Sequence, residues 1–241
     1  MGSLFSIFDK YPSLLIALSE KRDGSMKLSN HSSGDRIIVK NRRRFLNKLG
    51  FNPNLVINTN LVQGNVVKTV TKKDTGDTIA KTDGLLTGDK DIFLLITVAD
   101  CPPIFLYDYE KEIVGLIHGG WRGLAQEILA SAIEKFTNDF NSQTQNILAG
   151  IGPGICQHHY EVGKDVLSCF ESFPSAILKR EKKTFLDLKK IAKIQLLNLG
   201  LKEENIEISP ECTHCLVNKY FSYRRDKPKV LKTMMAIMGM K

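Results

Sequence analysis

The segment from Thr97 to Gly120, TVADCPPIFLYDYEKEIVGLIHGG, contains two extended apolar runs separated by a polar stretch. The β-branched and large apolar residues of both runs favour strands, and the polar residues 108–111 favour a turn. We therefore predict an antiparallel hairpin whose turn is centred between Tyr109 and Glu110. Such a hairpin commits the middle of the chain to a sheet with antiparallel neighbours.

The predicted register places Cys101 opposite His118, and opposed residues share one face with β-carbons about 4.5 to 5.5 Å apart. A thiolate and an imidazole at that separation can share a metal ion or form a nucleophile–base pair. The alternative is a cysteine that packs as a small hydrophobe beside a histidine satisfied by the backbone. Pro102 and Pro103 donate no ladder hydrogen bonds, so we expect the first strand to diverge or lie at a sheet edge. The Gly-Gly-Trp-Arg-Gly that follows precedes a helix whose free N–H groups, with Arg122, can hold an anion.

The rest of the chain predicts further strands and helices in alternation. Apolar and β-branched runs predict extended segments at residues 55–57, 66–70, 92–98, 205–208 and 221–226. A helical stripe of apolar residues runs from Leu124 to Phe136, and Asp187 is placed to cap a second helix that stops at Gly200. The 241 residues contain no linker or repeat, so we expect one α/β domain over residues 1–241, with mixed α+β layers around a mixed sheet.

Composition narrows the classes of function and location. The 34 Lys and Arg residues against 26 Asp and Glu give a net charge of +8, which favours anionic partners such as phosphate or nucleic acid. The basic residues at 40–44 and 179–183 are not interleaved with aromatic residues, so we predict no nucleic-acid partner. The five cysteines are irregularly spaced and odd in number, which indicates a reducing, cytoplasmic location. The longest apolar run is far too short to span a membrane, and we predict no membrane partner.

Four motifs in the same order resemble those of the YfiH/YlmD-type laccase-domain family, whose older label is polyphenol oxidase. They are Ala99–Pro103, His118–Gly123, Gly152–Pro153 with Tyr160–Gly163, and Phe221–Asp226. Weaker similarities are Gly34–Asp35 with Asn41–Arg42, and Asp83–Thr87. The resemblance covers roughly residues 20 to 238.

The resemblance implies one α/β domain related in fold to the bacterial toxin glutamine deamidases. It implies a zinc site formed by a histidine, Cys101 and His118. It also implies purine nucleoside phosphorolysis, with adenosine deamination and methylthioadenosine cleavage as companion activities. The polyphenol-oxidase label implies copper, which suits a chain with five histidines less well because multicopper sites use many imidazoles.

The chain departs from the family at one predicted metal ligand. The family's first zinc histidine lies in a Gln-x-His-Gly motif, and the best match, Leu61–Asn65, puts Gln63 at that position. A catalytic zinc normally has three protein ligands plus water, and an amide is a poor ligand. With Gln63, the set of Cys101 and His118 is therefore one ligand short. The histidines available to complete it are His31, His158, His159 and His214.

Three hypotheses follow for function. The first is an enzyme that cleaves purine nucleosides with phosphate, in which Cys101 and His118 act at the reaction centre and Arg42 and Arg122 hold phosphate. The second is a metal-free cysteine hydrolase with Cys101 as nucleophile and His118 as base. The third is a non-catalytic protein that retains the fold and has lost the site at Gln63.

Two remaining motifs have weaker meaning. Cys212-Thr-His-Cys215 has the Cys-x-x-Cys spacing of a redox pair or half a zinc site. Without a second half we predict local packing for it. Arg224 and Arg225 are expected to reach either a carboxylate in the core or a substrate.

Overall fold

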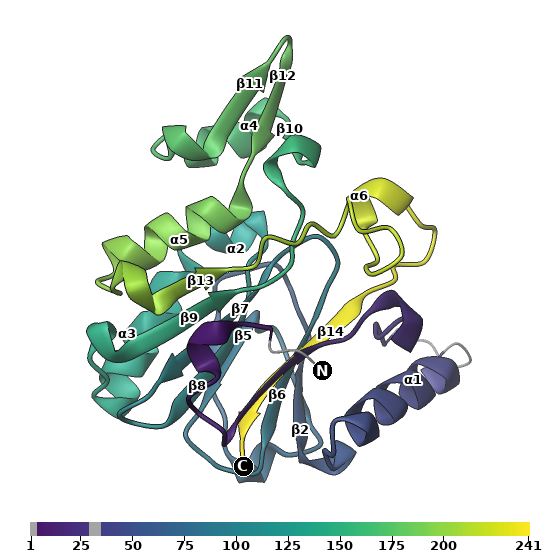
Figure 1. Cartoon of the computed structure of the whole chain (residues 1–241), viewed down its shortest axis with the longest axis vertical. Coiled ribbons are helices and arrows are strands. Elements are labelled where there is room, and N and C mark those ends of the chain that lie inside the picture. Colours follow the sequence, from purple (N-terminus) through teal and green to yellow (C-terminus); the bar gives the residue numbers. More distant parts are fainter. Residues whose placement is uncertain (1–3, 29–34) are drawn as a thin grey trace.

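The computed structural model describes residues 4–28 and 35–241, and its centre is a pair of large sheets packed face to face (Figure 1). The five-stranded sheet has the order β1 (Leu14–Leu18), β14 (Met234–Met240), β6 (Phe93–Val98), β2 (Val56–Thr59) and β4 (Thr78–Ile79). The six-stranded sheet has the order β13 (Ile206–Ile208), β9 (Ile147–Ile151), β7 (Pro103–Asp108), β8 (Ile113–His118), β5 (Gly84–Thr87) and β3 (Val67–Thr69). Both sheets mix parallel and antiparallel pairs.

Helices cover the outer faces of both sheets. The helices are α1 (Asp35–Lys48), α2 (Trp121–Ala125), α3 (Ile128–Phe140), α4 (Lys164–Leu167), α5 (Leu188–Asn198) and α6 (Tyr223–Asp226). Helices α3 and α5 pack on the six-stranded sheet, and α1 packs on the five-stranded sheet. The molecule therefore has helix, sheet, sheet and helix layers, which confirms the predicted α/β class with mixed layers.

Strand β7 shows how the sequence produces these layers. Phe105 and Tyr107 enter the core between the two sheets, whereas Ile104 and Leu106 enter the core beneath α3 and α5. All four side chains are almost fully buried. Successive strand residues point to opposite faces, so a strand buried on both sides must be apolar throughout.

Pro103 is the first residue of β7, and β7 lies between β8 and β9 in the interior of the sheet. The edge alternative is therefore excluded, whereas the divergence alternative holds, because pairing with β8 begins at Pro103 and leaves Cys101 and Pro102 outside the ladder. A proline is tolerated here because the first residue of a strand need not donate. The carbonyl groups of Pro102 and Pro103 accept instead, from the N–H groups of Gly119 and Gly152 at 2.9 and 2.8 Å.

The hairpin register differs from the prediction by two residues. Pro103, not Cys101, lies opposite His118, and Asp108 pairs with Ile113. The strand continues to Asp108 because its Oδ1 accepts the N–H groups of Glu110 and Lys111, which builds the turn one position later than expected. Because strand side chains alternate with a period of two, this shift leaves Cys101 on the same face as His118.

The predicted helices are partly confirmed. Asp187 caps α5 by accepting the N–H of Lys190 at 3.0 Å, as expected. The stripe from Leu124 to Phe136 is divided between α2 and α3 because Glu127 adopts a left-handed conformation with φ 59°. Residues 223–226, expected to be extended, form α6. Ser222 caps the N-terminus of this helix, because its side chain accepts the N–H of Arg225. The described residues include no helix long and apolar enough to cross a membrane.

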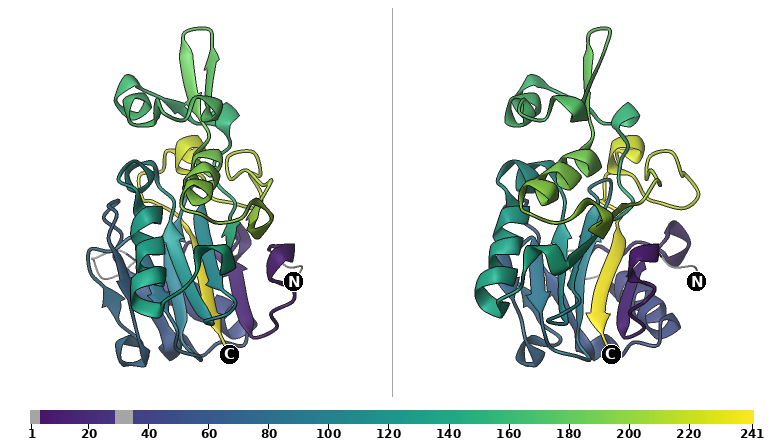
Figure 2. Two further views of the ribbon diagram at one scale, coloured as in Figure 1. Left: turned by 90° about the vertical axis from the view of Figure 1, so that its left-hand side faces the viewer. Right: turned by 60° about the vertical axis from the view of Figure 1, so that its left-hand side comes forward.

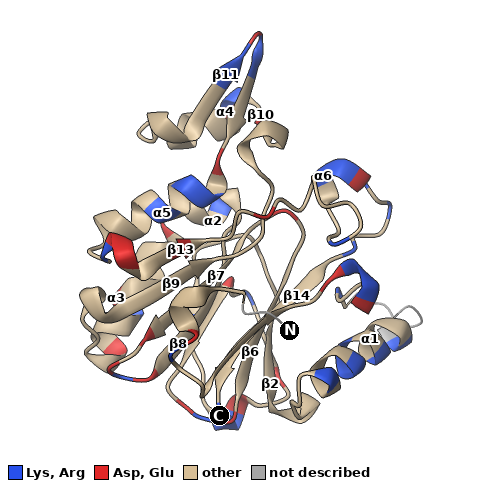
Figure 3. Ribbon diagram, in the orientation of Figure 1, with Lys and Arg blue, Asp and Glu red and all other residues tan. Residues whose placement is uncertain are grey.

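A third, smaller sheet projects beyond the two large ones (Figure 2). It contains β10 (Glu161–Val162), β12 (Lys183–Leu186) and β11 (Ile177–Arg180), with α4 beside it. The two basic stretches of the sequence lie on the hairpin of β11 and β12 and on α1, at opposite ends of the molecule (Figure 3). They therefore form two separate basic segments.

Candidate functional site

Cys101 and His118 meet at the end of the six-stranded sheet. His118 is the last residue of β8 and pairs with Pro103, and Cys101 lies two residues before Pro103, just outside the paired strand. The Cys101 sulfur lies close enough to His118 to act on it electrostatically. A β-carbon added to Gly120 would lie 2.9 Å from Cε1 of His118 and 3.4 Å from Sγ of Cys101, so a glycine is needed beside this pair. The predicted meeting of the two side chains is confirmed, although by a different register.

Asp83 is a third member of this group, and the sequence analysis gave it no role. Gly84 pairs with Ile117 across β5 and β8, which places Asp83 opposite His118. The backbone N–H of His118 donates to the carbonyl of Asp83 at 2.8 Å, and Oδ1 of Asp83 lies 3.4 Å from Nδ1 of His118. The weak Asp83–Thr87 similarity was the signal that could have identified it.

The Asp83 carboxylate also organises the loop that contains Gln63. The carboxylate is fully buried and accepts three successive backbone N–H groups, those of Val62, Gln63 and Gly64, at 3.1, 2.9 and 3.0 Å. Burial opposes ionisation, but His118 and these N–H groups outweigh it and hold the pKa of Asp83 below its usual value. One ionised side chain thus joins this loop to His118.

The environment of His118 favours its charged form. Burial disfavours an imidazolium, but the electrostatic effect of the Cys101 sulfur and the hydrogen bond to Asp83 outweigh it and raise the pKa of His118 to about 9. His118 is only 6% exposed. At neutral pH it is therefore a buried proton donor between two acceptors.

Asp100 fixes the backbone that presents Cys101. Its φ of 80° lies in a region that non-glycine residues adopt only when their surroundings enforce it. Its carboxylate accepts from the hydroxyl of Thr213 at 2.6 Å and from the N–H of Arg224 at 2.7 Å, while its carbonyl accepts from Ile155 at 2.8 Å. Strained backbone of this kind is concentrated at functional sites.

Two arginines and a tyrosine surround the same point. Burial raises the pKa of Tyr160, nearby Cys101 raises it further, and the guanidinium groups of Arg224 and Arg122 oppose the shift. The Arg224 guanidinium lies 5.0 Å from the centre of the Tyr160 ring. Cys101, Tyr160, Arg122 and Arg224 therefore share one electrostatic environment. Arg225 differs, because it donates to the carbonyls of three residues of the neighbouring loop, Thr213, His214 and Tyr220.

The structure places Arg42 on α1, away from this group. Its guanidinium donates to the carbonyl of Met26 and to the side chain of Asn58, both at 2.7 Å. It lines a surface cavity of about 330 Å³ between α1 and β2 that includes neither Cys101 nor His118. These contacts tie α1 to the five-stranded sheet.

The predicted zinc ligands do not form a three-ligand site. Gln63 is exposed, has a φ of 60°, and its amide oxygen accepts from Arg122 at 2.7 Å. Among the described residues, Cys101 and His118 belong to no group of three Cys, His, Asp or Glu side chains close enough to share a metal ion. His158 is exposed, His159 and His214 stack on each other elsewhere, and His31 and Gly34 lie outside the described residues.

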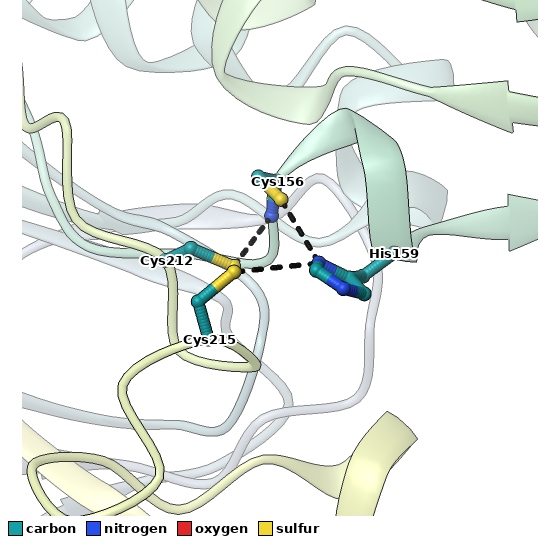
Figure 4. A group of neighbouring side chains, drawn as sticks. All are labelled: Cys156, His159, Cys212 and Cys215. Atoms are coloured by element: carbon teal, nitrogen blue, oxygen red, sulfur yellow. Dashed lines mark hydrogen bonds between the residues drawn. The ribbon is translucent and has the colours of Figure 1, made fainter.

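A different group of side chains could hold a metal ion. The ligand atoms of Cys156, His159, Cys212 and Cys215 all lie within 4.8 Å of one another (Figure 4). The sequence analysis found no second half for the Cys212–Cys215 motif, and the structure supplies one in Cys156 and His159. The missing half was present in the sequence as Cys156-Gln-His-His159, with the same spacing of three.

Replacing Gln63 with histidine should create metal binding at Cys101 and His118. The Asp83 carboxylate already holds the backbone of residue 63 beside His118, so an imidazole there supplies the third ligand. We expect zinc bound per chain, measured by elemental analysis after dialysis, to rise by about one equivalent over the wild type. The matched variant Gln143→His, at an exposed position, should leave zinc content unchanged. No increase, or an increase that survives Cys101→Ser, would contradict the prediction.

Comparisons with known proteins agree with this fold and with the motifs around the site. The family model described as multi-copper polyphenol oxidoreductase laccase matches residues 16–241. The chain is 31% identical over 219 residues to purine nucleoside phosphorylase YlmD of Bacillus subtilis (strain 168), covering 86% of this chain and 78% of that protein. It is also 31% identical over 149 residues to adenosine deaminase RL5 of an unknown prokaryotic organism, covering 59% and 56% of the two chains.

A solved structure extends the similarity over almost the whole chain. The crystal structure of YlmD from Geobacillus stearothermophilus superimposes with a TM-score of 0.91 and 27% identity, covering 97% of this chain and 94% of that one. The sequence motifs, the layered fold and these matches agree with one another. The chain belongs to the laccase-like YfiH/YlmD family, the family of the multi-copper polyphenol oxidoreductase laccase model.

Proposed function

We propose that this protein is a purine nucleoside phosphorylase. The observation that carries the proposal is the buried imidazolium of His118, held between Cys101 and Asp83, with Tyr160 and the guanidinium groups of Arg122 and Arg224 in the electrostatic environment of Cys101. Relatives named purine nucleoside phosphorylase and adenosine deaminase support the substrate class. Copper oxidation chemistry is a poorer match, because the group contains one thiol and one imidazole whereas multicopper sites need many imidazoles.

The proton on His118 is suited to the departing purine. In phosphorolysis the bond between the purine nitrogen and C1′ of ribose breaks, and a phosphate oxygen forms a new bond to C1′. The leaving purine carries the electron pair of the broken bond and must gain a proton. His118 donates that proton and regains one from the hydroxyl of the incoming hydrogen phosphate, so the products are the neutral purine and ribose 1-phosphate.

The guanidinium groups are suited to phosphate. Arg122 is exposed, stacks on Trp121 at 4.4 Å and is fixed by Gln63 at 2.7 Å, so it presents its remaining N–H groups in a defined direction. Arginine binds phosphate oxygens through paired charge-assisted hydrogen bonds. In this proposal Arg122, with Arg224 near Tyr160, binds the anion, and Arg42 keeps a structural role. The same bond is cleaved in methylthioadenosine, which we propose as a second substrate.

Chromatography of products tests the proposal. The purified protein is incubated with adenosine, with and without inorganic phosphate. We expect adenine and ribose 1-phosphate only when phosphate is present. Inosine in both mixtures would instead identify adenosine deamination as the main activity. Recovery of unchanged adenosine in every mixture would overturn the proposal and favour a non-catalytic protein.

The group formed by Cys101, His118 and Asp83 also favours a second candidate function, that of a cysteine hydrolase. A nucleophile, a base and a carboxylate that orients the base are the parts of such a site, and all three are in contact here. In the presence of a chelator, iodoacetamide should then label Cys101 much faster than Cys169, which is an exposed cysteine outside the site. Equal rates at the two positions would count against the hydrolase.

A further inference from the structure

We infer that Cys156, His159, Cys212 and Cys215 bind one Zn²⁺ ion as a four-coordinate structural site, separate from the Cys101–His118 group. The four residues come from two loops that are far apart in the sequence. Each loop supplies two ligands with two residues between them. Three cysteines and one histidine in this paired spacing are a ligand set that structural zinc sites use.

The distances within the group are those of side chains around a common centre. Nδ1 of His159 lies 3.2 Å from Sγ of Cys156 and 3.4 Å from Sγ of Cys215. A zinc ion at about 2.3 Å from sulfur and about 2.0 Å from nitrogen keeps neighbouring ligand atoms roughly 3.5 to 3.8 Å apart. The ligand atoms need only small movements to reach that geometry. Figure 4 shows the side chains converging from both loops.

The backbone around Cys212 is arranged to stabilise a thiolate. The N–H of Cys156 donates to its sulfur at 3.2 Å. Cys212 is buried, and an unpaired buried thiolate would be unfavourable without a positive charge nearby. A zinc ion supplies that charge and has the affinity for thiolates that this site requires.

A disulfide explains the group less well than a metal ion. All the cysteines of the chain are unpaired in the structure. A disulfide between any two of the three sulfurs would not explain why the third cysteine and Nδ1 of His159 also lie at the same point. The stacking of the His159 ring on His214, at 4.0 Å, holds that nitrogen towards the sulfurs.

The location of the group indicates a structural role. Four protein ligands leave no open position for a substrate, as in structural zinc sites. Tyr160 directly follows His159, and Thr213, which bonds Asp100, lies between Cys212 and Cys215. Within the described residues, the only β-pairing between the two loops is an isolated bridge from Gly154 to Cys212. A zinc ion would hold together the two loops that position Tyr160 and Asp100.

Metal analysis of matched variants tests the inference. The full-length wild type, Cys215→Ser, Cys101→Ser and Cys169→Ser are each saturated with Zn²⁺, dialysed and assayed for zinc per chain. We expect about one equivalent in the wild type, in Cys101→Ser and in Cys169→Ser, and almost none in Cys215→Ser. Equal zinc in all four proteins, none in the wild type, or loss only in Cys101→Ser would overturn the inference.

A second measurement on the wild type alone guards against a variant that fails to fold. Chelator-treated protein is titrated with Co²⁺, and we expect the thiolate-to-cobalt charge-transfer absorption of a tetrahedral site to saturate at about one equivalent. Zn²⁺ should also slow iodoacetamide labelling of Cys156, Cys212 and Cys215 but not of Cys169. Protection of Cys101 alone, or an intramolecular disulfide in freshly prepared protein, would refute the site. Neither measurement uses a nucleoside, so the outcome does not depend on the proposed enzyme activity.

Discussion

Replacing Cys101 with alanine should reduce turnover of adenosine with phosphate, but by less than the about 10² to 10⁴-fold that loss of a positioned proton transfer would cost, because His118 remains as the acid. The Cys101 sulfur is a principal cause of the raised pKa of His118, so its removal lowers that pKa and reduces the protonated fraction. The loss should fall mainly on kcat, because the proton is transferred in the transition state. Steady-state rates with adenosine as the varied substrate measure it.

The pH dependence gives this variant a second, independent signature. The reaction requires the acid form of His118, so activity in the wild type declines as pH rises through the pKa of about 9. In Cys101→Ala the residual activity should decline at lower pH, because the pKa of His118 has fallen. The matched variant Cys169→Ala, at an exposed position, should retain both rate and profile. A Cys101→Ala enzyme with wild-type turnover would remove Cys101 from the mechanism.

Alternation of side chains made the central contact predictable from sequence. The prediction that Cys101 and His118 meet used a turn at the wrong place, and the actual strand pair is shifted by two residues. A shift of two leaves every side chain on its original face, whereas a shift of one would have separated the pair. The face of the sheet on which a side chain lies was therefore easier to predict than the register of the two strands. Asp108 determined the register through two hydrogen bonds in the turn, which the sequence pattern did not reveal.

The missed residues came from parts of the chain with no local signal. Asp83 reaches His118 across β5 and β8, which are separated by two other strands in sequence, so its partner depends on sheet order. Cys156 and His159 meet Cys212 and Cys215 only because two loops lie side by side. Strand and helix periodicity reports burial within one element. It carries no information on which loops become neighbours, so these contacts could not be predicted from the sequence.

The role of Gln63 also needed the structure. The family resemblance implies that a metal ligand is replaced by the Gln63 amide, and the sequence alone leaves open whether the metal is retained. The structure shows the amide oxygen accepting from Arg122, with the loop backbone bound by Asp83. The substitution therefore orders an arginine at the position where the family resemblance implies a metal ligand. A cation is therefore bound to the side chain of residue 63 even without the third ligand.

Replacing Asp83 with asparagine should lower the free energy of unfolding by about 3 to 5 kcal/mol, the range for removing one partner of a buried ionic group. The carboxylate accepts three backbone N–H groups and contacts the charged His118. An asparagine of the same size keeps one acceptor oxygen and turns an NH₂ towards the other donors, so buried N–H groups are left unsatisfied. Urea unfolding at pH 7 measures the change.

Acid pH should shrink this difference. Since the pKa of Asp83 is lowered on folding, its contribution to stability is present above the unfolded value of about 3.9 and is lost as pH falls through the folded pKa. The gap between wild type and Asp83→Asn should therefore be widest near neutral pH and narrower at about pH 3. The variant Asp89→Asn provides the control, because that partly exposed carboxylate accepts a single N–H from Lys72 and should cost less than about 1 kcal/mol. If the two variants were equally stable at pH 7, Asp83 would not be the residue that joins the Gln63 loop to His118.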